Sequence, residues 1–104
     1  MAHITGGGIA GNLNRILPSG LSAEVDVSKI QILPIFKFIR KKSNADDAEM
    51  LKTFNMGVGM TIVVRKGSEN EFIGHFGSFD LNSYVIGRII KGDKTVRLVG
   101  ELKY

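Results

Sequence analysis

The sequence predicts an α/β or α+β fold, a mixed β-sheet with helices packed on it, on the basis of three patterns. Residues 21–27 alternate between apolar and polar side chains, which is typical of a half-buried strand. Residues 60–64 form a nearly continuous apolar run, which predicts a strand covered on both faces. Apolar residues recur at helical spacing in other segments, as in 9–17. Strands that alternate with helices in this way favour a sheet with helices against it.

The first half of the chain contains three predicted helices. A short strand before the glycines at 6–8 leads into the helix over 9–17, which Pro18 ends. After the strand over 21–27, Pro34 suits the first turn of a second helix. Polar residues at 43–47 can cap a third helix, which we expect from Asp46 to Phe54.

The second half continues from the strand at 60–64 with one helix and two strands. Ser68 and Glu71 have the spacing of a capping box, which predicts a helix from about Glu69 to Phe76. Strands are predicted over 84–90 and 96–102, and the turn at Gly92 between them predicts a hairpin. The predicted order is therefore strand, helix, strand, two helices, strand, helix and two strands.

Length and composition limit the class of protein. A chain of 104 residues with 43% hydrophobic and 23% charged residues fits one small globular domain. The absence of cysteine excludes disulfides, zinc–cysteine sites and thiol chemistry. No apolar run approaches the ~20 residues that a membrane helix needs, and no secretory signal is visible. We therefore expect a cytoplasmic protein without a membrane partner.

The formal net charge of +4 is compatible with nucleic-acid binding or with anionic metabolites. The basic residues are spread out, and we expect no nucleic-acid partner. The exception is a cluster on the second helix: Lys37, Arg40, Lys41 and Lys42. Positive charge toward a helix C-terminus complements the helix dipole. A solvated helix end is therefore favoured over an anion site for this cluster.

The sequence Ala-His-Ile-Thr-Gly-Gly-Gly at residues 2–8 combines a short strand, three glycines and a helix start. Glycine permits positive φ and a close approach of the backbone to a ligand. The first amides of a helix lack intrahelical acceptors, and with the helix dipole they favour a bound anion. Thr5 adds a hydroxyl donor. The pattern matches neither a P-loop nor a full dinucleotide fingerprint, so a phosphate site and a plain tight turn both fit it.

Three segments resemble the phosphoribosylformylglycinamidine cyclo-ligase family, also called aminoimidazole ribonucleotide synthetase, of purine biosynthesis. They are AHITGGGIAGNLNRILP at the start, FKFIRKKSNADDAEMLKTFNMGVGMTIVV in the middle and YVIGRII near the end. The resemblance covers nearly the whole chain but only the last portion of that family's enzymes. It implies that residues 1–104 form one incomplete C-terminal domain and that the ATP-binding N-terminal domain is absent.

The resemblance implies an ATP-dependent ring closure that converts formylglycinamidine ribonucleotide to aminoimidazole ribonucleotide. The formyl oxygen is activated by phosphoryl transfer and then displaced by an amidine nitrogen, with release of ADP and phosphate. In the family, ATP and Mg²⁺ bind mainly to the N-terminal domain, and we expect no metal site in this chain. We expect the chain to be inactive alone. We also expect it to bind a phosphorylated small molecule and to form a homo-oligomer, a dimer.

The candidate site residues come from two segments that match the family's motifs. The candidates for substrate or phosphate binding are Thr5, Gly6, Gly7, Gly8, Asn12, Arg15, Asn55 and Gly57. His3, which stands just before the glycines, is a candidate for proton transfer or for contact with an anion, and a structural role is the alternative.

Several of these assignments have alternatives. Arg15 can bind phosphate through its guanidinium fork, or it can pair with a neighbouring carboxylate. Asn55 can bind ligand or tie down the turn that follows it. The chain also departs from the family, because Gly11 stands where Glu is common, Asn14 where Pro is common, and Met56 where Cys is usual.

Two other functions compete with the cyclo-ligase. One is a small non-enzymatic domain that binds an anionic metabolite or associates with itself, because an incomplete α/β domain exposes strand edges and apolar surface. The other is another member of the same superfamily, such as selenophosphate synthetase or thiamine-monophosphate kinase. The His-Ile-Thr-Gly-Gly-Gly and Thr-Phe-Asn segments disfavour this second alternative.

Overall fold

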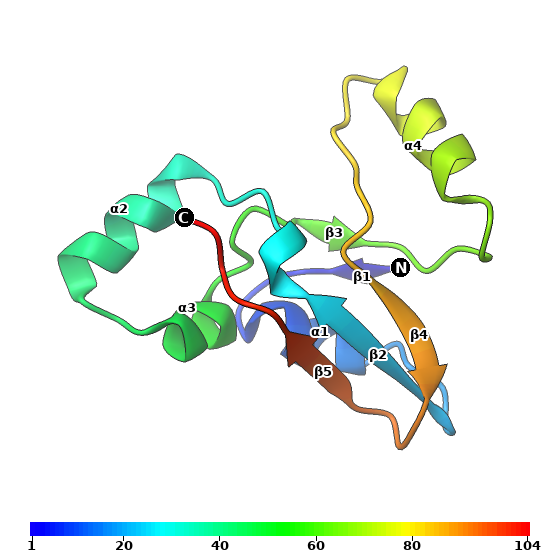
Figure 1. Cartoon of the computed structure of the whole chain (residues 1–104), viewed down its shortest axis with the longest axis horizontal. Helices are drawn as coiled ribbons and strands as arrows, with labels where there is room; N and C mark the ends of the chain where they lie inside the picture. Colours follow the sequence, from blue (N-terminus) through cyan, green and yellow to red (C-terminus); the bar gives the residue numbers. More distant parts are fainter.

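A computed structural model describes the whole chain, residues 1–104, and its elements follow the predicted order (Figure 1). The strands are β1 (Ala2–His3), β2 (Leu21–Asp26), β3 (Met60–Thr61), β4 (Gly87–Lys91) and β5 (Val96–Val99). The helices are α1 (Gly8–Asn14), α2 (Pro34–Ser43), α3 (Asp47–Thr53) and α4 (Glu69–Gly77), with the short 3-10 helix η1 (Val27–Lys29) after β2. The predicted α+β class is confirmed. None of these helices is long and apolar enough to cross a membrane.

The strands form two small sheets. β2 is the centre of a three-stranded sheet, in which it runs antiparallel to β4 and parallel to β5. This sheet is mixed, as the sequence predicts. β1 and β3 form a separate antiparallel pair, in which His3 lies opposite Met60.

The predicted hairpin between the last two strands is wrong, because β2 lies between β4 and β5. The connection from β4 to β5 crosses the start of β2 and bonds to it. The amide of Gly92 donates to the Gly20 carbonyl at 3.1 Å, and the amide of Lys94 donates to the Leu21 carbonyl at 2.9 Å. A central position satisfies both backbone edges of β2 and buries Ala23 and Val25, two of the apolar residues of its alternating pattern.

The core lies where α1 packs against both α3 and the three-stranded sheet. Five side chains in it are fully buried: Ile4, Ile9, Val25, Met50 and Met56. They come from the start of the chain, from α1, from β2, from α3 and from the segment after α3. The core therefore joins the glycine segment to the middle of the sequence.

The prediction that residues 60–64 form a strand covered on both faces is wrong. Only Met60 and Thr61 are in β3, and Met60, Ile62 and Val63 are exposed. The apolar pattern alone cannot say which element covers a strand. In this structure α4, the next element along the chain, does not pack on β3, and Figure 1 shows it on an arm that projects from the rest of the molecule.

The capping box predicted for α4 does not form. Ser68 is the N-cap residue, but its side chain makes no capping hydrogen bond. The carboxylate of Glu69 instead accepts the amide of Gly67 at 3.0 Å. Aromatic side chains gather along this helix and after it, with Phe72 near Phe76 and with the ring of His75 edge-on to Phe79.

A hydrogen-bonded carboxylate marks the end of β2. The Ser28 hydroxyl donates to Asp26 Oδ1 at 2.6 Å, and the Ser28 amide donates to the same oxygen at 3.0 Å. These two bonds, the hydroxyl first, lower the pKa of Asp26 below 3.8. Because the folded pKa is depressed, this carboxylate stabilises the fold above pH 3.8, and the contribution is lost as pH falls through the folded value.

We expect Ser28→Ala to raise the pKa of Asp26 toward 3.8, because the hydroxyl donor is removed and the amide donor remains. A carboxyl-carbon NMR titration measures this pKa directly. Ser19→Ala, at an exposed turn residue before β2, is the control and leaves the Asp26 pKa unchanged. An Asp26 pKa equal in wild type and Ser28→Ala would contradict the assignment.

Candidate functional site

The glycine turn, residues 5–8, connects β1 to α1 and borders a pocket of about 660 Å³. Gly6 and Gly7 line this pocket with residues of α2, of α3 and of the segment between them. The polar lining residues are Ser43, Glu49, Lys52 and Thr53. The structure therefore places two of the predicted glycines at a cavity that is also lined by one lysine, one glutamate and two residues with hydroxyl groups.

Asn12 holds the turn in place from inside α1. Its side-chain amide donates to the carbonyls of Thr5 at 3.2 Å, Gly6 at 3.3 Å and Gly8 at 2.8 Å. Its Oδ1 accepts the Thr5 hydroxyl at 3.1 Å. Asn12 is only 4% exposed; its bond to Gly8 is buried, and the other three bonds are partly buried. The side chains of Thr5 and Asn12 thus bond to each other, and Asn12 also bonds to the backbone of the turn.

Positive φ angles shape the turn. Gly7, the N-cap of α1, has φ of 98°, and Gly8 has φ of 71°. A Cβ on Gly8 would overlap the Leu51 carbonyl of α3, whereas a Cβ on Gly6 would meet nothing within 4 Å. Gly8 therefore allows α3 to approach α1 closely, while Gly6 and Gly7 remain at the surface.

The second predicted segment lies directly beside the first. The Asn55 side-chain amide donates to the Ile4 carbonyl at 3.3 Å, and Asn55 Oδ1 accepts the Gly57 amide at 2.9 Å. Gly57 has φ of 110°, and a Cβ on it would lie 2.9 Å from Leu33 Cγ. These contacts support the interpretation that Asn55 ties down the turn after α3. They also join two motifs that lie fifty residues apart.

The other two candidates lie farther from the turn. His3 is exposed on β1, opposite Met60. Arg15 follows the last residue of α1, and the seven-residue helix rises about 10 Å between its ends. The structure gives Arg15 no carboxylate partner, whereas Arg40 and Arg88 both have one. The alternative of a salt bridge for Arg15 is therefore not supported.

The pocket contains a charge that sequence reasoning missed. Lys52 lies on α3 and borders the cavity with Gly6 and Gly7, together with the carboxylate of Glu49. Local patterns gave no signal for it, because only the packing of α3 against α1 brings it to the glycine turn. Lys52 stands directly before the Thr-Phe-Asn motif, and this is the only feature of the sequence that connects it with the candidate site.

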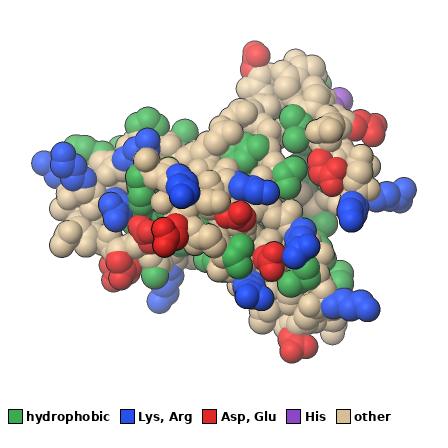
Figure 2. Space-filling model, in the orientation of Figure 1, with side chains coloured by type: hydrophobic (Ala, Val, Ile, Leu, Met, Phe, Trp, Pro, Cys, Tyr) green, Lys and Arg blue, Asp and Glu red, His purple; other side chains and the backbone are tan.

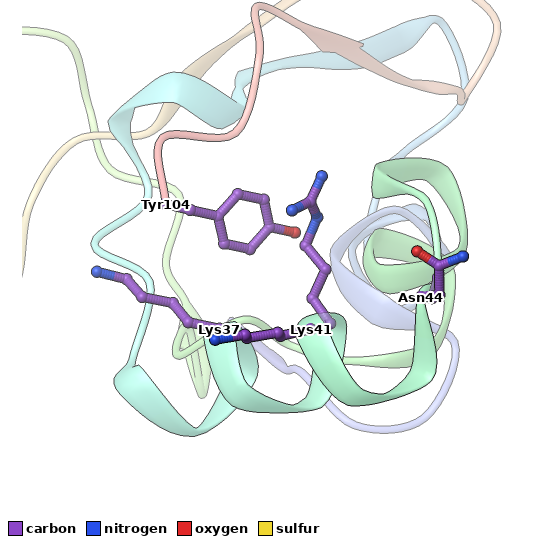
Figure 3. Close-up of a pocket in the computed structure, with 6 residues that line it drawn as sticks. Lys37, Lys41, Asn44 and Tyr104 are labelled. Carbon is purple, nitrogen blue, oxygen red and sulfur yellow. The ribbon is translucent and has the colours of Figure 1, made fainter.

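A second hollow of about 430 Å³ adjoins the first, and Ala45 lines both. Figure 3 shows Lys37 and Lys41 projecting from α2 near the ring of Tyr104. The Arg40 guanidinium lies 4.5 Å from the centre of that ring, and its Nε is 3.3 Å from Asp47 Oδ1. Burial, and then the neighbouring Asp47 carboxylate, raises the pKa of Tyr104 above 10.0.

This second hollow does not overturn the interpretation of the basic cluster as a solvated helix end. Arg40 is already engaged by Asp47 and Tyr104, and Lys42 lies 5.8 Å from the ring of Phe38. Figure 2 shows basic and acidic side chains interspersed over the visible face of the molecule, without one large basic area. The glycine turn is therefore the stronger candidate for an anion site.

Comparison with known proteins identifies the family. The AIR synthase related protein, C-terminal domain, family matches residues 1–100 of the chain. The chain is 45% identical over 98 residues to phosphoribosylformylglycinamidine cyclo-ligase of Caldicellulosiruptor saccharolyticus, a match that covers 94% of the chain and 29% of that protein. It is 41% identical over 93 residues to the enzyme of the same name from Bacillus subtilis, a match that covers 89% of the chain and 27% of that protein.

A similar match extends to a longer protein. The chain is 43% identical over 90 residues to a bifunctional purine biosynthetic protein of Dictyostelium discoideum, covering 86% of the chain and 11% of that protein. The chain belongs to the AIR synthase related protein, C-terminal domain, family. It spans less than a third of the length of the cyclo-ligases that it matches.

The packing at Gly8 gives a direct test of the turn's geometry. We expect Gly8→Ala to lower the free energy of unfolding by about 2–4 kcal/mol, because the new Cβ meets the Leu51 carbonyl at positive φ. Gly11→Ala is the matched control on the same helix, where a Cβ meets nothing within 4 Å. Because alanine favours helix, we expect this control to stabilise the chain by up to about 1 kcal/mol.

Urea unfolding followed by circular dichroism measures both free energies. Equal effects of the two substitutions would show that α3 does not approach the turn as described.

Proposed function

We propose that this chain provides the C-terminal portion of a phosphoribosylformylglycinamidine cyclo-ligase and is inactive by itself. The observation that carries the proposal is 41–45% identity to cyclo-ligases over about nine-tenths of the chain. The arrangement of the two motifs supports it, because both resemble cyclo-ligase segments and contact each other through Asn55 and Ile4. The lengths of those relatives support the requirement for further polypeptide, since this chain spans less than a third of them.

In the proposed reaction the formyl oxygen of formylglycinamidine ribonucleotide attacks the γ-phosphorus of ATP, and ADP leaves. The amidine nitrogen then bonds to the activated carbon, the carbon–oxygen bond breaks, and phosphate and a proton are released. Such chemistry depends mainly on positioning and on stabilising charge. We propose that ATP and Mg²⁺ bind mainly to the part of a cyclo-ligase outside this chain.

The proposed role of this chain is to hold a phosphate group of the substrate at the glycine turn. Gly6 and Gly7 are exposed beside the N-terminal end of α1, where the helix dipole favours an anion. Lys52 borders the same cavity with a positive charge, and the carboxylate of Glu49 also lies at its border. The hydrogen bonds from Asn12 fix the turn before ligand binds, so ordering the turn costs little binding free energy.

A chimeric enzyme tests the proposed function. In it, the 93 matched residues of the Bacillus subtilis cyclo-ligase are replaced by the corresponding stretch of this chain. We expect turnover of formylglycinamidine ribonucleotide to fall by no more than about tenfold, a cost of about 1.4 kcal/mol. The free chain, assayed alone with ATP, is the control and shows no turnover. A chimera that folds but lacks turnover would contradict the proposal, and so would turnover by the free chain.

An NMR titration of the free chain tests the phosphate site. We expect saturable amide shifts at Gly6, Gly7 and Gly8 with formylglycinamidine ribonucleotide, and none with the same compound lacking its 5′-phosphate. Lys52→Ala should weaken binding by about threefold, because one exposed charge at the border of the pocket is lost. Lys66→Ala, an exposed lysine outside the pocket, is the matched control. Identical shifts with and without the phosphate would count against the site.

A further inference from the structure

The part of the glycine-turn pocket that α2 supplies is only loosely attached to the rest of the molecule. Ile39 and Ser43 of α2 line this pocket together with Gly6 and Gly7. No residue of α2 is buried, and no other helix or strand packs extensively against this helix. A segment with few buried contacts opens locally at a low free-energy cost. The position of α2 therefore depends on a small number of side-chain contacts.

Apolar contacts attach α2 to the core beside the pocket. Phe36 and Ile39 pack against the buried core side chains, and both stay partly exposed. The ring centroid of Phe36 lies 5.7 Å from that of Phe54, which also lines the pocket. Because apolar contacts are not directional, they keep α2 near the pocket without fixing its distance from α3.

A second attachment joins α2 to two other segments through Arg40, Asp47 and Tyr104, here called the clamp. Arg40 Nε lies 3.3 Å from Asp47 Oδ1 at the start of α3, and the Arg40 guanidinium lies 4.5 Å from the centre of the Tyr104 ring. Figure 3 shows this ring reaching α2 from the segment after β5. Asp47 Oδ1 is shielded from water and makes no hydrogen bond, so the charge of Arg40 compensates it.

The clamp and the wall of the pocket share one short stretch of chain. Arg40 directly follows Ile39, and Asp47 stands two residues before Glu49, so each of these two clamp residues lies close in sequence to a lining residue. Ala45, in the connection between α2 and α3, lines both hollows. If the clamp is released, α2 can move away from α3, and the wall that it supplies moves with it.

We propose that Arg40 is a positioning residue, which holds α2 against α3 through the clamp and so sets the distance between the α2 wall and the glycine turn. This inference rests on the proposed function, because it takes a phosphorylated compound as the ligand of the pocket. Arg40 does not itself line that pocket. It acts on binding by preorganising the wall, which lowers the cost of ordering α2 when the ligand binds.

Binding of formylglycinamidine ribonucleotide to the free chain, measured by the amide shifts of Gly6 and Gly7, tests the proposal. We expect Arg40→Gln to weaken binding by about threefold in about 0.15 M salt, because the exposed ion pair is lost and α2 moves away from the turn.

Lys41→Gln is the matched control, since it removes the same charge from the same helix. Lys41 lines the same hollow as Arg40, but no carboxylate pairs with it. We expect this control to change the dissociation constant by less than about 1.5-fold, because salt screens an exposed charge outside the pocket. Equal effects of the two substitutions would show that only net charge matters, and would overturn the proposal.

A double-mutant cycle with Asp47→Asn shows whether Arg40 acts through the clamp. When Asp47→Asn is already present, we expect Arg40→Gln to change the dissociation constant by less than about 1.5-fold, because the ion pair is then broken. A role in global stability alone would leave the dissociation constant of every folded variant unchanged, and would overturn the proposal. A direct contact of Arg40 with the ligand would overturn it too, since the loss would be the same in both backgrounds.

Relaxation dispersion of the Ile39 methyl groups gives a readout that needs no ligand. We expect Arg40→Gln to increase microsecond-to-millisecond exchange at Ile39, and Lys41→Gln to leave it unchanged. If the ribonucleotide binds wild type and Arg40→Gln equally, the phosphate site stands and the positioning role is wrong. If it does not bind the wild-type chain, the phosphate site fails, and dispersion at Ile39 decides whether Arg40 holds α2. Equal dispersion in wild type and Arg40→Gln would overturn the proposal.

Discussion

The close approach of α3 to Gly8 is the contact on which the rest of this structure depends. Only a residue without a Cβ fits there, because Gly8 has positive φ and faces the Leu51 carbonyl. This contact lets α1 pack on α3, and it places Lys52 beside the glycine turn. Without it, the motif at the start of the chain and the motif after α3 would remain separate segments.

Two side-chain amides, the buried Asn12 and the half-buried Asn55, hold the same region together. Asn12 donates to three carbonyls of the turn, and Asn55 connects the end of β1 to the turn before β3. Both side chains thereby satisfy backbone groups of the turns that they hold. The polar residues that resemble the family's signatures therefore act here mainly on the backbone, while the exposed Gly6 and Gly7 face the cavity.

Local patterns predicted the order of the elements, since alternation, helical spacing and turn residues depend on neighbours in the sequence. They identified the alternating strand β2 and the helix that starts at Pro34. They failed where distant segments decide: β2 separates β4 from β5, and Met60, Ile62 and Val63 are exposed. For the candidate site too, local patterns identified some residues and only contacts between distant segments identified others. The glycines and Asn55 were visible as motifs, whereas Lys52 became a candidate only through the packing of two helices.

The most direct test of the central claim is a proton NOE measurement on the free chain at Gly8. The structure predicts cross-peaks between the Hα protons of Gly8 and protons of Leu51 and Phe54, whose carbonyls face this glycine. It also predicts cross-peaks from the Asn12 side-chain amide to the turn that it holds. Both sets together would show that the chain builds the site by itself. Their absence in a folded chain would show that the two motifs do not meet, and would contradict this account of the site.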